Sequence, residues 1–359
     1  VETQTTAWRT ALGPGEERGS WTLNPDSAQS SAFARLRQSV AELAQALTAA
    51  AARGKGLEQC AARGVALLAT VDFFTAQNTP NMVFWQEKKA RTVQLHATPL
   101  DVSALLQRHL LEPVESVVLT SATLRVGDSF ASTERALGLT AASTFTAASP
   151  FDYARQSLLY LPPAMPEPNH PTYTQACLEA AAPVIEASGG RTFFLFTSHR
   201  ALQEAAASLP QRLSFPILVQ GSMPRPRLLD RFRSLGNAVL LGAASFWEGV
   251  DVQGEALSCV IIDKLPFANP SDPILRARTE QCQAAGGEPF RELQIPQAVI
   301  ALRQGVGRLI RSETDRGVLM LCDPRLRSKG YGRIFLDSLP PMRRVSSLDA
   351  VHAFWRREA

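Results

Sequence analysis

The stretch QAVIALRQGVGRLIRSETDRGVLMLCD, residues 297–323, decides the fold of this chain. Its first part repeats polar residues three or four positions apart, and at about 100° per residue such positions share one side of an α-helix. The predicted polar stripe consists of Gln304, Gly307, Arg308 and Arg311. Shortly after it, Val318–Leu321 is a short apolar run typical of a buried β-strand.

The opposite side of this predicted helix is apolar and should face a core. It consists of Ile295, Val299, Leu302, Val306, Leu309 and Ile310. Pro296 suits the first helical turn, where its missing N–H group costs nothing. Two arginines on a rigid helix beside a glycine suit negative charge that develops on a transferring phosphoryl group. The plainer alternative to this phosphate role is that the two arginines form a basic face that is exposed to solvent.

Three other segments carry motifs, LTSATL at 119–124, FFLFTSHR at 193–200 and GAASFWEGVD at 242–251. Together with Q-x-x-G-R-x-x-R at 304–311, they resemble the ordered motifs of superfamily 2 helicases. SPF at 149–151 and DKLPFANP at 263–270 are similar to the XPD/DinG branch of iron–sulfur DNA helicases, and within it to the bacterial YoaA type. The resemblance covers about residues 82–345.

The resemblance implies an α/β fold built on RecA-like parallel sheets. Residues 1–81 are expected to be a helical portion of the arch domain, and 82–145 a remnant of the first motor domain. Residues 146–345 are expected to be the second RecA-like motor domain, followed by a C-terminal helix or tail at 346–359. The implied activity is that of an ATP-dependent 5′ to 3′ DNA helicase in repair or replication.

The N-terminal part predicts an antiparallel helical hairpin. Residues 1–25 are polar and irregular, and Asp26 is a candidate helix N-cap. The two predicted helices would share an apolar seam of Phe33, Leu36, Val40, Leu43, Leu47, Leu57, Cys60, Leu67, Leu68, Val71 and Phe74. Further on, short strands are predicted at Met82–Trp85, Val93–Leu95 and Ser116–Leu119, with a helix at Asp101–Leu111 between the last two.

The second motor domain shows five short apolar runs separated by helical or Gly/Pro-rich stretches. Continuous apolar runs are typical of parallel strands that are buried on both faces. The predicted strands are Phe193–Phe196, Ile217–Val219, Val239–Leu241, Val260–Ile262 and Val318–Leu321. Segments that follow the strands should meet at one sheet edge, which is where such sheets bind ligands.

Several features of the resembled family are missing. The chain contains no G-x-x-x-x-G-K-[ST] phosphate loop, because Gly54-Lys55 is followed by Gly56, and it contains no Asp-Glu dipeptide. Its five cysteines show no C-x-x-C spacing, so no metal site is predicted, and Cys259 and Cys322 lie in apolar runs as candidate core residues. The expectation is a C-terminal portion that does not hydrolyse ATP alone; ATP, Mg²⁺ and a 4Fe–4S cluster are implied only for the intact protein.

Composition excludes a membrane-spanning chain. With 359 residues, 45% hydrophobic and 19% charged, it is expected to be a soluble protein of two or three domains. No apolar run approaches the roughly 18 residues that span a bilayer. The unpaired cysteines and the resemblance favour a bacterial, cytoplasmic, nucleoid-associated protein. The net charge of +4 is compatible with DNA binding but does not argue for it.

The resemblance also implies roles for the nucleotide side of the site. Arg308 and Arg311, with Gln304 nearby, would sense the γ-phosphate of ATP. Residues expected in the cleft between motor domains are Glu248, Gly249, Asp251 and Gly307. A capped helix start with an acidic first turn explains the acidic pair as well. Ser121, Ala122 and Thr123 would couple hydrolysis to movement, or serve only as turn residues.

The predicted partner of the other loops is single-stranded DNA. The candidate contacts are Thr197, Ser198, Arg200, Gln220, Gly221, Phe246 and Trp247. Hydroxyl and guanidinium groups position a phosphate backbone, and exposed rings stack on bases. Helix capping by Thr197 or Ser198, and core packing of the two aromatic residues, are the alternatives.

The C-terminus combines aromatic and basic residues, Phe354, Trp355, Arg356 and Arg357. Such a cluster is the composition of an interaction anchor, and the YoaA-type resemblance implies the chi subunit of DNA polymerase III as its partner. The alternative is that the cluster docks on the chain's own domain. For the whole chain, the alternative function is a non-enzymatic module that binds single-stranded DNA or a replisome protein. An RNA-directed enzyme of the same superfamily also remains open.

Overall fold

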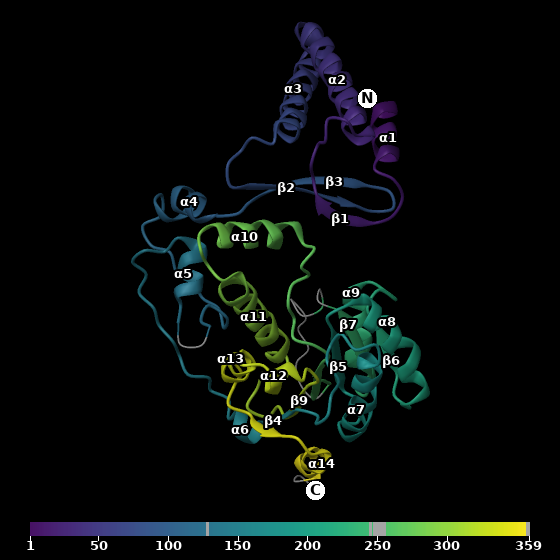
Figure 1. Cartoon of the computed structure of the whole chain (residues 1–359), viewed down its shortest axis with the longest axis vertical. Coiled ribbons are helices and arrows are strands. Elements are labelled where there is room, and N and C mark those ends of the chain that lie inside the picture. Colours follow the sequence, from purple (N-terminus) through teal and green to yellow (C-terminus); the bar gives the residue numbers. More distant parts are fainter. Residues whose placement is uncertain (127–128, 244–245, 247–255, 357–359) are drawn as a thin grey trace. The chain divides into compact units, whose positions relative to one another are not determined.

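The computed structural model describes residues 1–126, 129–243, 246 and 256–356. The chain forms two compact units (Figure 1). The first unit consists of Val1–Pro113 and Asn269–Pro289, and the second of Val114–Ala268 and Phe290–Ala359.

The second unit is built on a parallel sheet that has seven strands in its described part. The strands are β4 (Ser157–Tyr160), β5 (Thr192–Phe196), β6 (Ile217–Val219), β7 (Val239–Ala243), β8 (Cys259–Ile262), β9 (Gly317–Leu321) and β10 (Arg343–Val345). Their order is β10-β4-β9-β8-β5-β7-β6, and every neighbouring pair is parallel. All five strands predicted here are confirmed. The strands β4 and β10 were not predicted; β10 has the sequence RRV and is mostly exposed, so it shows no apolar run.

Helices cover both faces of this sheet. The helices α7 (Tyr173–Ala187), α8 (His199–Ser208) and α14 (Leu348–Arg356) pack on one face. The other face carries α9 (Arg225–Leu235), α11 (Ile295–Val306), α12 (Arg325–Ser328) and α13 (Gly332–Ser338). Alternate residues of one strand enter opposite cores; Phe193 and Leu195 of β5 pack on the α9 side, Phe194 and Phe196 on the α7 side. The two-sided burial predicted for these apolar runs is therefore confirmed.

The first unit has its own small core. It contains α1 (Glu2–Ala11), α2 (Ala28–Ala50), α3 (Lys55–Ala76), α10 (Pro273–Ala284) and an antiparallel sheet in the order β1-β2-β3. The strands are β1 (Glu17–Ser20), β2 (Met82–Lys88) and β3 (Val93–Pro99). The expectation of an irregular segment at 1–25 is wrong, because Trp8 and Trp21 bury their rings against Phe33. The predicted boundary between residues 81 and 82 does not divide the structure either, since β1 pairs with β2.

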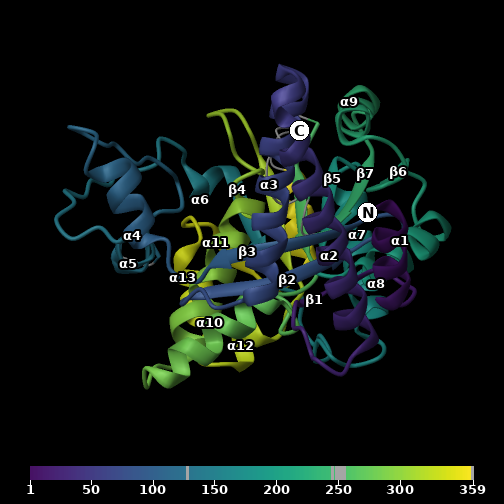
Figure 2. The same cartoon turned by 90° about the horizontal axis from the view of Figure 1, so that it is seen from above.

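The predicted helical hairpin is confirmed, and α2 and α3 lie side by side in both views (Figures 1 and 2). Ser27, rather than Asp26, caps α2. The predicted seam is partly wrong, because the helices approach through small residues. A Cβ atom on Gly64 would lie 3.3 Å from the Cα atom of Ala44, which is a tight contact, so a glycine suits this close approach. This close approach leaves several of the predicted seam residues exposed, namely Leu43, Leu57, Cys60 and Leu67.

The segment that precedes β4 has little regular structure. It contains α4 (Ser103–Leu106), a π-helical turn at Gln107–Leu111, α5 (Ala131–Leu137) and α6 (Tyr153–Gln156). The predicted helix at Asp101–Leu111 is thus present in two short pieces. The predicted strand at Ser116–Leu119 is wrong: these residues pair with no strand in the described chain, and Val118 is 85% exposed.

Replacing Gly190 with alanine should destabilise the second unit by more than about 2 kcal/mol. Gly190 is buried with φ +81°, and an added Cβ atom would lie 2.0 Å from the carbonyl oxygen of Asn237. Gly236→Ala is the matched control, because its φ is +67° and its Cβ would meet no atom within 4 Å. The control should cost only about 1 kcal/mol. Urea unfolding of both variants measures the difference, and equal costs would contradict the packing argument.

Candidate functional site

The carboxyl edge of the parallel sheet carries polar residues directly after four strands. Thr197 follows β5, Gln220 follows β6, Asp263 follows β8, and Asp323 comes two residues after the end of β9. Parallel strands end at the same edge, so the topology brings together residues far apart in the sequence. This edge is the candidate site.

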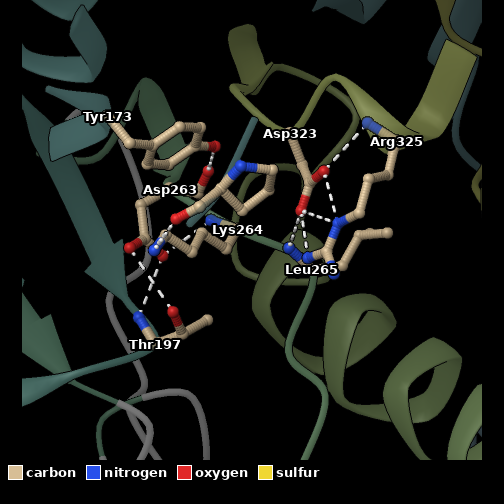
Figure 3. Close-up of polar contacts among 8 residues, drawn as sticks. Tyr173, Thr197, Asp263, Lys264, Leu265, Asp323 and Arg325 are labelled. Carbon is tan, nitrogen blue, oxygen red and sulfur yellow. Dashed lines mark hydrogen bonds and ion pairs between the residues drawn. The ribbon is translucent and has the colours of Figure 1, made fainter. Parts of the chain in front are cut away.

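Asp263 organises the centre of the edge (Figure 3). Its carboxylate accepts hydrogen bonds from the backbone N–H groups of Thr197 (2.9 Å) and Lys264 (2.7 Å), and a long contact from the Thr197 hydroxyl (3.4 Å). The side chain is buried, and burial raises the pKa of Asp263 to about 6, although the backbone donors act in the opposite direction. The loop after β5 is therefore fixed to the loop after β8 through one carboxylate.

Lys264 and Tyr173 complete this cluster. The Lys264 ammonium donates to the carbonyl oxygen of Pro168 at 2.6 Å and lies 4.7 Å from the centre of the Tyr173 ring. The Tyr173 hydroxyl donates to the Asp263 carbonyl oxygen at 2.6 Å, and burial raises its pKa. The Tyr173 bond is buried and the Lys264 bond partly buried, so both constrain the backbone of this edge.

A second buried carboxylate lies beside the first. Asp323 accepts from the Leu265 N–H group at 2.8 Å and from the guanidinium of Arg325 at 2.6 to 3.1 Å (Figure 3). The Asp323 side chain is 2% exposed, so the pair is a desolvated ion pair with geometry close to bidentate. It holds the start of the 264–268 segment against the loop after β9.

No role was predicted from the sequence for Asp263, Lys264, Tyr173, Asp323 or Arg325. The first two appeared only within the DKLPFANP run that resembled a helicase branch. A usable signal was present, because each aspartate closely follows a buried apolar run, and a charged residue at that position lies at the ligand-binding edge of a parallel sheet. Their burial and their partners could be known only from the fold.

The predicted DNA-contacting loop lies at this edge. Ser198 is the N-cap of α8 and accepts from the Ala201 N–H group at 3.2 Å, as the capping alternative anticipated. The Arg200 side chain is exposed in the first turn of the same helix. Thr197 and Ser198 are thus used structurally, the first through its backbone N–H group and the second as a helix cap.

Gln220 and Gly221 lie at the neighbouring strand end. The Gln220 side-chain oxygen accepts from the Ala243 N–H group at 2.6 Å and so connects the ends of β6 and β7. Gly221 has φ +91°, a left-handed conformation that favours glycine, and its Cβ position opens onto free space. The backbone here is tightly turned and accessible.

The expectation that the Phe246 ring is exposed is wrong. Phe246 is 5% exposed and packs in the core, and its Cβ atom would lie 2.8 Å from a Cβ added to Gly242. The guanidinium of Arg225 lies 5.1 Å from the centre of its ring. Core packing was the stated alternative for this residue. Other predicted positions lie outside the described residues, namely Trp247, Glu248, Gly249, Asp251 and Arg357.

The helix that was expected to carry both arginines ends early. All six residues expected on the apolar side of the stripe are buried, but α11 stops at Val306, and Gly307 is its exposed C-cap. Gln304 lies on the helix, whereas Arg308 and Arg311 lie beyond it. The single polar helical stripe is therefore wrong. The physical reason is the turn that brings Leu309 against Gly317, the first residue of β9.

The two arginines lie in different surroundings. Burial, together with the nearby guanidinium of Arg225, lowers the pKa of Arg308. Arg311 and Ser312 donate their N–H groups to the Asp315 carboxylate at 2.7 and 2.9 Å. Gln156, the last residue before β4, donates to the carbonyl oxygens of Ser312 and Asp315. The backbone of this turn therefore lies at the amino ends of β4 and β9, the opposite edge from Thr197.

The predicted coupling residues lie on an exposed turn. The hydroxyl groups of Ser121 and Thr123 are 3.0 Å apart, and the Thr123 N–H group donates to the Ser121 hydroxyl at 3.1 Å. Ala122 lies between them and is exposed. These local hydrogen bonds are also what residues that serve only to form a turn would make.

The C-terminal aromatic cluster docks on its own unit. Phe354 is 4% exposed in the core under α14, and the Arg316 guanidinium lies 4.5 Å from the centre of its ring and donates to its carbonyl oxygen. Trp355 packs partly against the same core, while Arg356 is exposed. The expectation of an exposed cluster is wrong for Phe354. This residue instead follows the alternative, in which the cluster docks on the chain's own domain.

The described residues do not fit a 4Fe–4S cluster. The cysteines lie on separate elements, with Cys60 on α3, Cys177 on α7, Cys259 in β8 and Cys282 on α10, and Cys322 follows β9. Within the described ranges, no three His, Cys, Asp or Glu side chains are grouped to hold a metal. Cys259 and Cys322 are buried, as predicted. None of the described helices has the length and apolarity to cross a membrane.

Comparisons with known proteins place this geometry in a family. Residues 182–342 match the helicase C-terminal domain. ATP-dependent DNA helicase YoaA of Escherichia coli is 45% identical over 271 residues, which are 76% of this chain and 43% of that protein. YoaA of Haemophilus influenzae is 40% identical over 349 residues, 97% of this chain and 54% of that protein. ATP-dependent helicase DinG of Mycobacterium tuberculosis is 39% identical over 286 residues, 77% of this chain and 43% of that protein.

Solved structures agree on the fold. XPD in its apo form has a TM-score of 0.61 at 15% identity, covering 96% of this chain and 68% of that one. An XPD helicase structure has a TM-score of 0.59 at 14% identity, covering 96% and 61%. The chain thus carries a RecA-like helicase domain. Its residues 182–342 carry a helicase C-terminal domain, the chain is similar to the YoaA and DinG helicases, and it spans about half the length of the curated relatives it matches.

Asp263→Asn should remove a pH dependence of folding stability. The native carboxyl binds its proton more tightly than the unfolded one, so Asp263 stabilises the fold below about pH 4 and loses this contribution as pH rises through about 6. Asparagine keeps an acceptor oxygen and cannot ionise, so the variant should be about 1–3 kcal/mol more stable than wild type at pH 8.

Urea unfolding between pH 4 and pH 8 measures this effect. Asp349→Asn is the control, because Asp349 is exposed in the first turn of α14 and should leave the pH profile unchanged. A wild-type profile that stays parallel to that of Asp263→Asn would show that Asp263 keeps an ordinary pKa.

Arg325→Ala should destabilise the second unit by about 3–5 kcal/mol, because it leaves the buried Asp323 carboxylate without its cation. Arg333→Ala, which breaks an exposed ion pair with Asp337, should cost less than about 1 kcal/mol. Thermal unfolding compares the two. Similar melting temperatures for both variants would mean that the buried pair is not a constraint on the edge.

Proposed function

We propose that this chain is the ATP-sensing and DNA-tracking half of an ATP-dependent 5′ to 3′ DNA helicase that acts in DNA repair or replication. The observation that carries the proposal is the match of residues 182–342 to the helicase C-terminal domain, which includes the Q-x-x-G-R-x-x-R pattern at 304–311. The names of the relatives supply the activity, and the proposal transfers it to the intact protein.

The arginines are proposed to act on the nucleotide. Arg308 and Arg311, with Gln304 nearby, would stabilise the charge that develops on the γ-phosphoryl group, and Gly307 together with Glu248, Gly249 and Asp251 would line the cleft. The lowered pKa of Arg308 supports this role: a half-buried guanidinium beside a second guanidinium, that of Arg225, is a favourable position for a polyanion. Such a group would gain more from a bound phosphate than an exposed arginine would.

The carboxyl edge is proposed to carry single-stranded DNA. Thr197, Ser198, Arg200, Gln220, Gly221 and Trp247 would contact the DNA, and the polar groups would position the phosphate backbone without reading its sequence. The fixation of the Thr197 backbone by Asp263 supports this proposal, because a preorganised loop loses little entropy when a ligand binds. Phe246 is omitted from the contact surface because it is buried.

The chain alone is proposed to be inactive as an ATPase. ATP and Mg²⁺ would be held by the intact protein, since this sequence has no G-x-x-x-x-G-K-[ST] loop, and its described cysteines do not suit the cluster implied by the family. Ser121, Ala122 and Thr123 would couple hydrolysis to movement. Arg356 with Arg357 is the remaining candidate contact for a replisome partner such as the chi subunit, in a cytoplasmic, nucleoid-associated setting.

A second candidate function is a non-enzymatic module that binds single-stranded DNA or a replisome protein. Two observations favour this binding function: the loops after the strands are exposed, and the sequence contains no G-x-x-x-x-G-K-[ST] phosphate loop. An affinity for single-stranded DNA that is the same with and without ATP in the full-length protein would support this function over the motor.

Arg308→Ala in the full-length protein should lower DNA-stimulated ATP hydrolysis by about 10³-fold or more, as loss of an arginine finger does. Steady-state hydrolysis with saturating single-stranded DNA measures it. Arg333→Ala is the matched control, because this arginine is 88% exposed on α13 and should leave the rate unchanged. Wild-type protein without ATPase activity, or an Arg308 variant at the wild-type rate, would overturn the nucleotide role of this arginine.

A further inference from the structure

One arginine of α11 holds the exposed LTSATL turn. The Arg303 guanidinium donates from Nη1 to the carbonyl oxygen of Arg125 and from Nη2 to that of Ala122, both at 2.5 Å. The two acceptors lie at either end of a short stretch of the turn, so one planar group fixes both. The sequence analysis gave Arg303 no role.

The charge of Arg303 strengthens both bonds, and the bond to Arg125 is also partly buried, whereas the bond to Ala122 is exposed. Burial, followed by the charge of the neighbouring Arg125, lowers the pKa of Arg303. Neither acceptor is a carboxylate, so a partly desolvated cation is paired with the backbone of the turn. Bonds from a charged donor in a partly buried place are stronger than those between neutral groups.

Other contacts hold the same segment in place. Val126 packs against the apolar core on the α11 side of the sheet, and the Thr133 hydroxyl donates to the Leu124 carbonyl oxygen at 2.6 Å. Arg135 and Glu292 form an ion pair at 3.7 Å, but both side chains are largely exposed, so this pair contributes little. Of the contacts in the described part of the chain named here, those of Arg303 connect the turn directly to α11.

The same helix leads to the arginines of the Q-x-x-G-R-x-x-R pattern. Arg303 precedes Gln304, α11 ends at Val306, and Arg308 follows one residue beyond its C-cap. A helix transmits displacement along its axis because its backbone hydrogen bonds keep it rigid. A shift of the turn at Ala122 would thus move the end of α11 and, with it, the position of Arg308.

We propose that Arg303 is a positioning residue that couples the LTSATL turn to the nucleotide-sensing arginines. In this proposal Arg303 contacts neither nucleotide nor DNA. It transmits a displacement of the LTSATL turn through α11 to Arg308. This inference rests on the proposed function, because it assigns a connection within that motor. It predicts that loss of Arg303 separates DNA binding from hydrolysis without abolishing either.

Arg303→Ala in the full-length protein should reduce the stimulation of ATP hydrolysis by single-stranded DNA by about tenfold, since it removes two charge-assisted hydrogen bonds. The hydrolysis rate without DNA and the affinity for single-stranded DNA should stay within about twofold of wild type. Arg303→Lys keeps the charge but not the planar fork, so it should show intermediate stimulation. It also preserves the test if the alanine variant folds poorly.

Arg135→Ala is the matched control, because it removes the exposed ion pair of the same segment and should keep full stimulation. Stimulation in both Arg303 variants equal to wild type would overturn the inference while the proposed function stands. An equal loss of the rates with and without DNA would also overturn it, because Arg303 would then act on folding or on hydrolysis itself. Wild-type protein that lacks DNA-stimulated hydrolysis would overturn the proposed function.

Discussion

Burial of both faces of the parallel sheet is the constraint on which the second unit depends. The central strands expose no face to water, so their residues alternate between two cores, and helices must cover each side. This arrangement forces every connection to return across the sheet before the next strand. The strand ends and the loops that follow them are consequently gathered at one edge, where side chains from distant parts of the sequence meet.

At that edge the polar groups are held by buried carboxylates. Asp263 connects the loops after β5 and β8, and Asp323, paired with Arg325, connects the segment after β8 to the loop after β9. A buried charge is costly unless its hydrogen bonds are satisfied, so each aspartate accepts several donors. The result is an edge whose backbone is positioned by electrostatics as well as by packing.

Positive charge in the second unit is carried by arginines in several different places. Arg308 lies near Arg225, Arg303 holds the turn at Ala122, and Arg316 packs on Phe354. These arginines differ in partner and burial, so the same residue type serves three purposes: a candidate phosphate contact, a connection between segments and a docking contact for α14. Their chemistry follows from surroundings that sequence spacing does not encode.

The sequence by itself determined the parallel α/β fold, five of the strands, the helical hairpin and the helicase family, because apolar runs and ordered motifs are local signals. Only the tertiary structure decided that α11 ends before Arg308, that Phe246 and Phe354 are buried, and that Trp8 and Trp21 build a core from a polar-looking segment. The same holds for Asp263 and Arg303. Burial and hydrogen-bond partners are set by residues 66 to 181 positions away, so no local pattern specifies them.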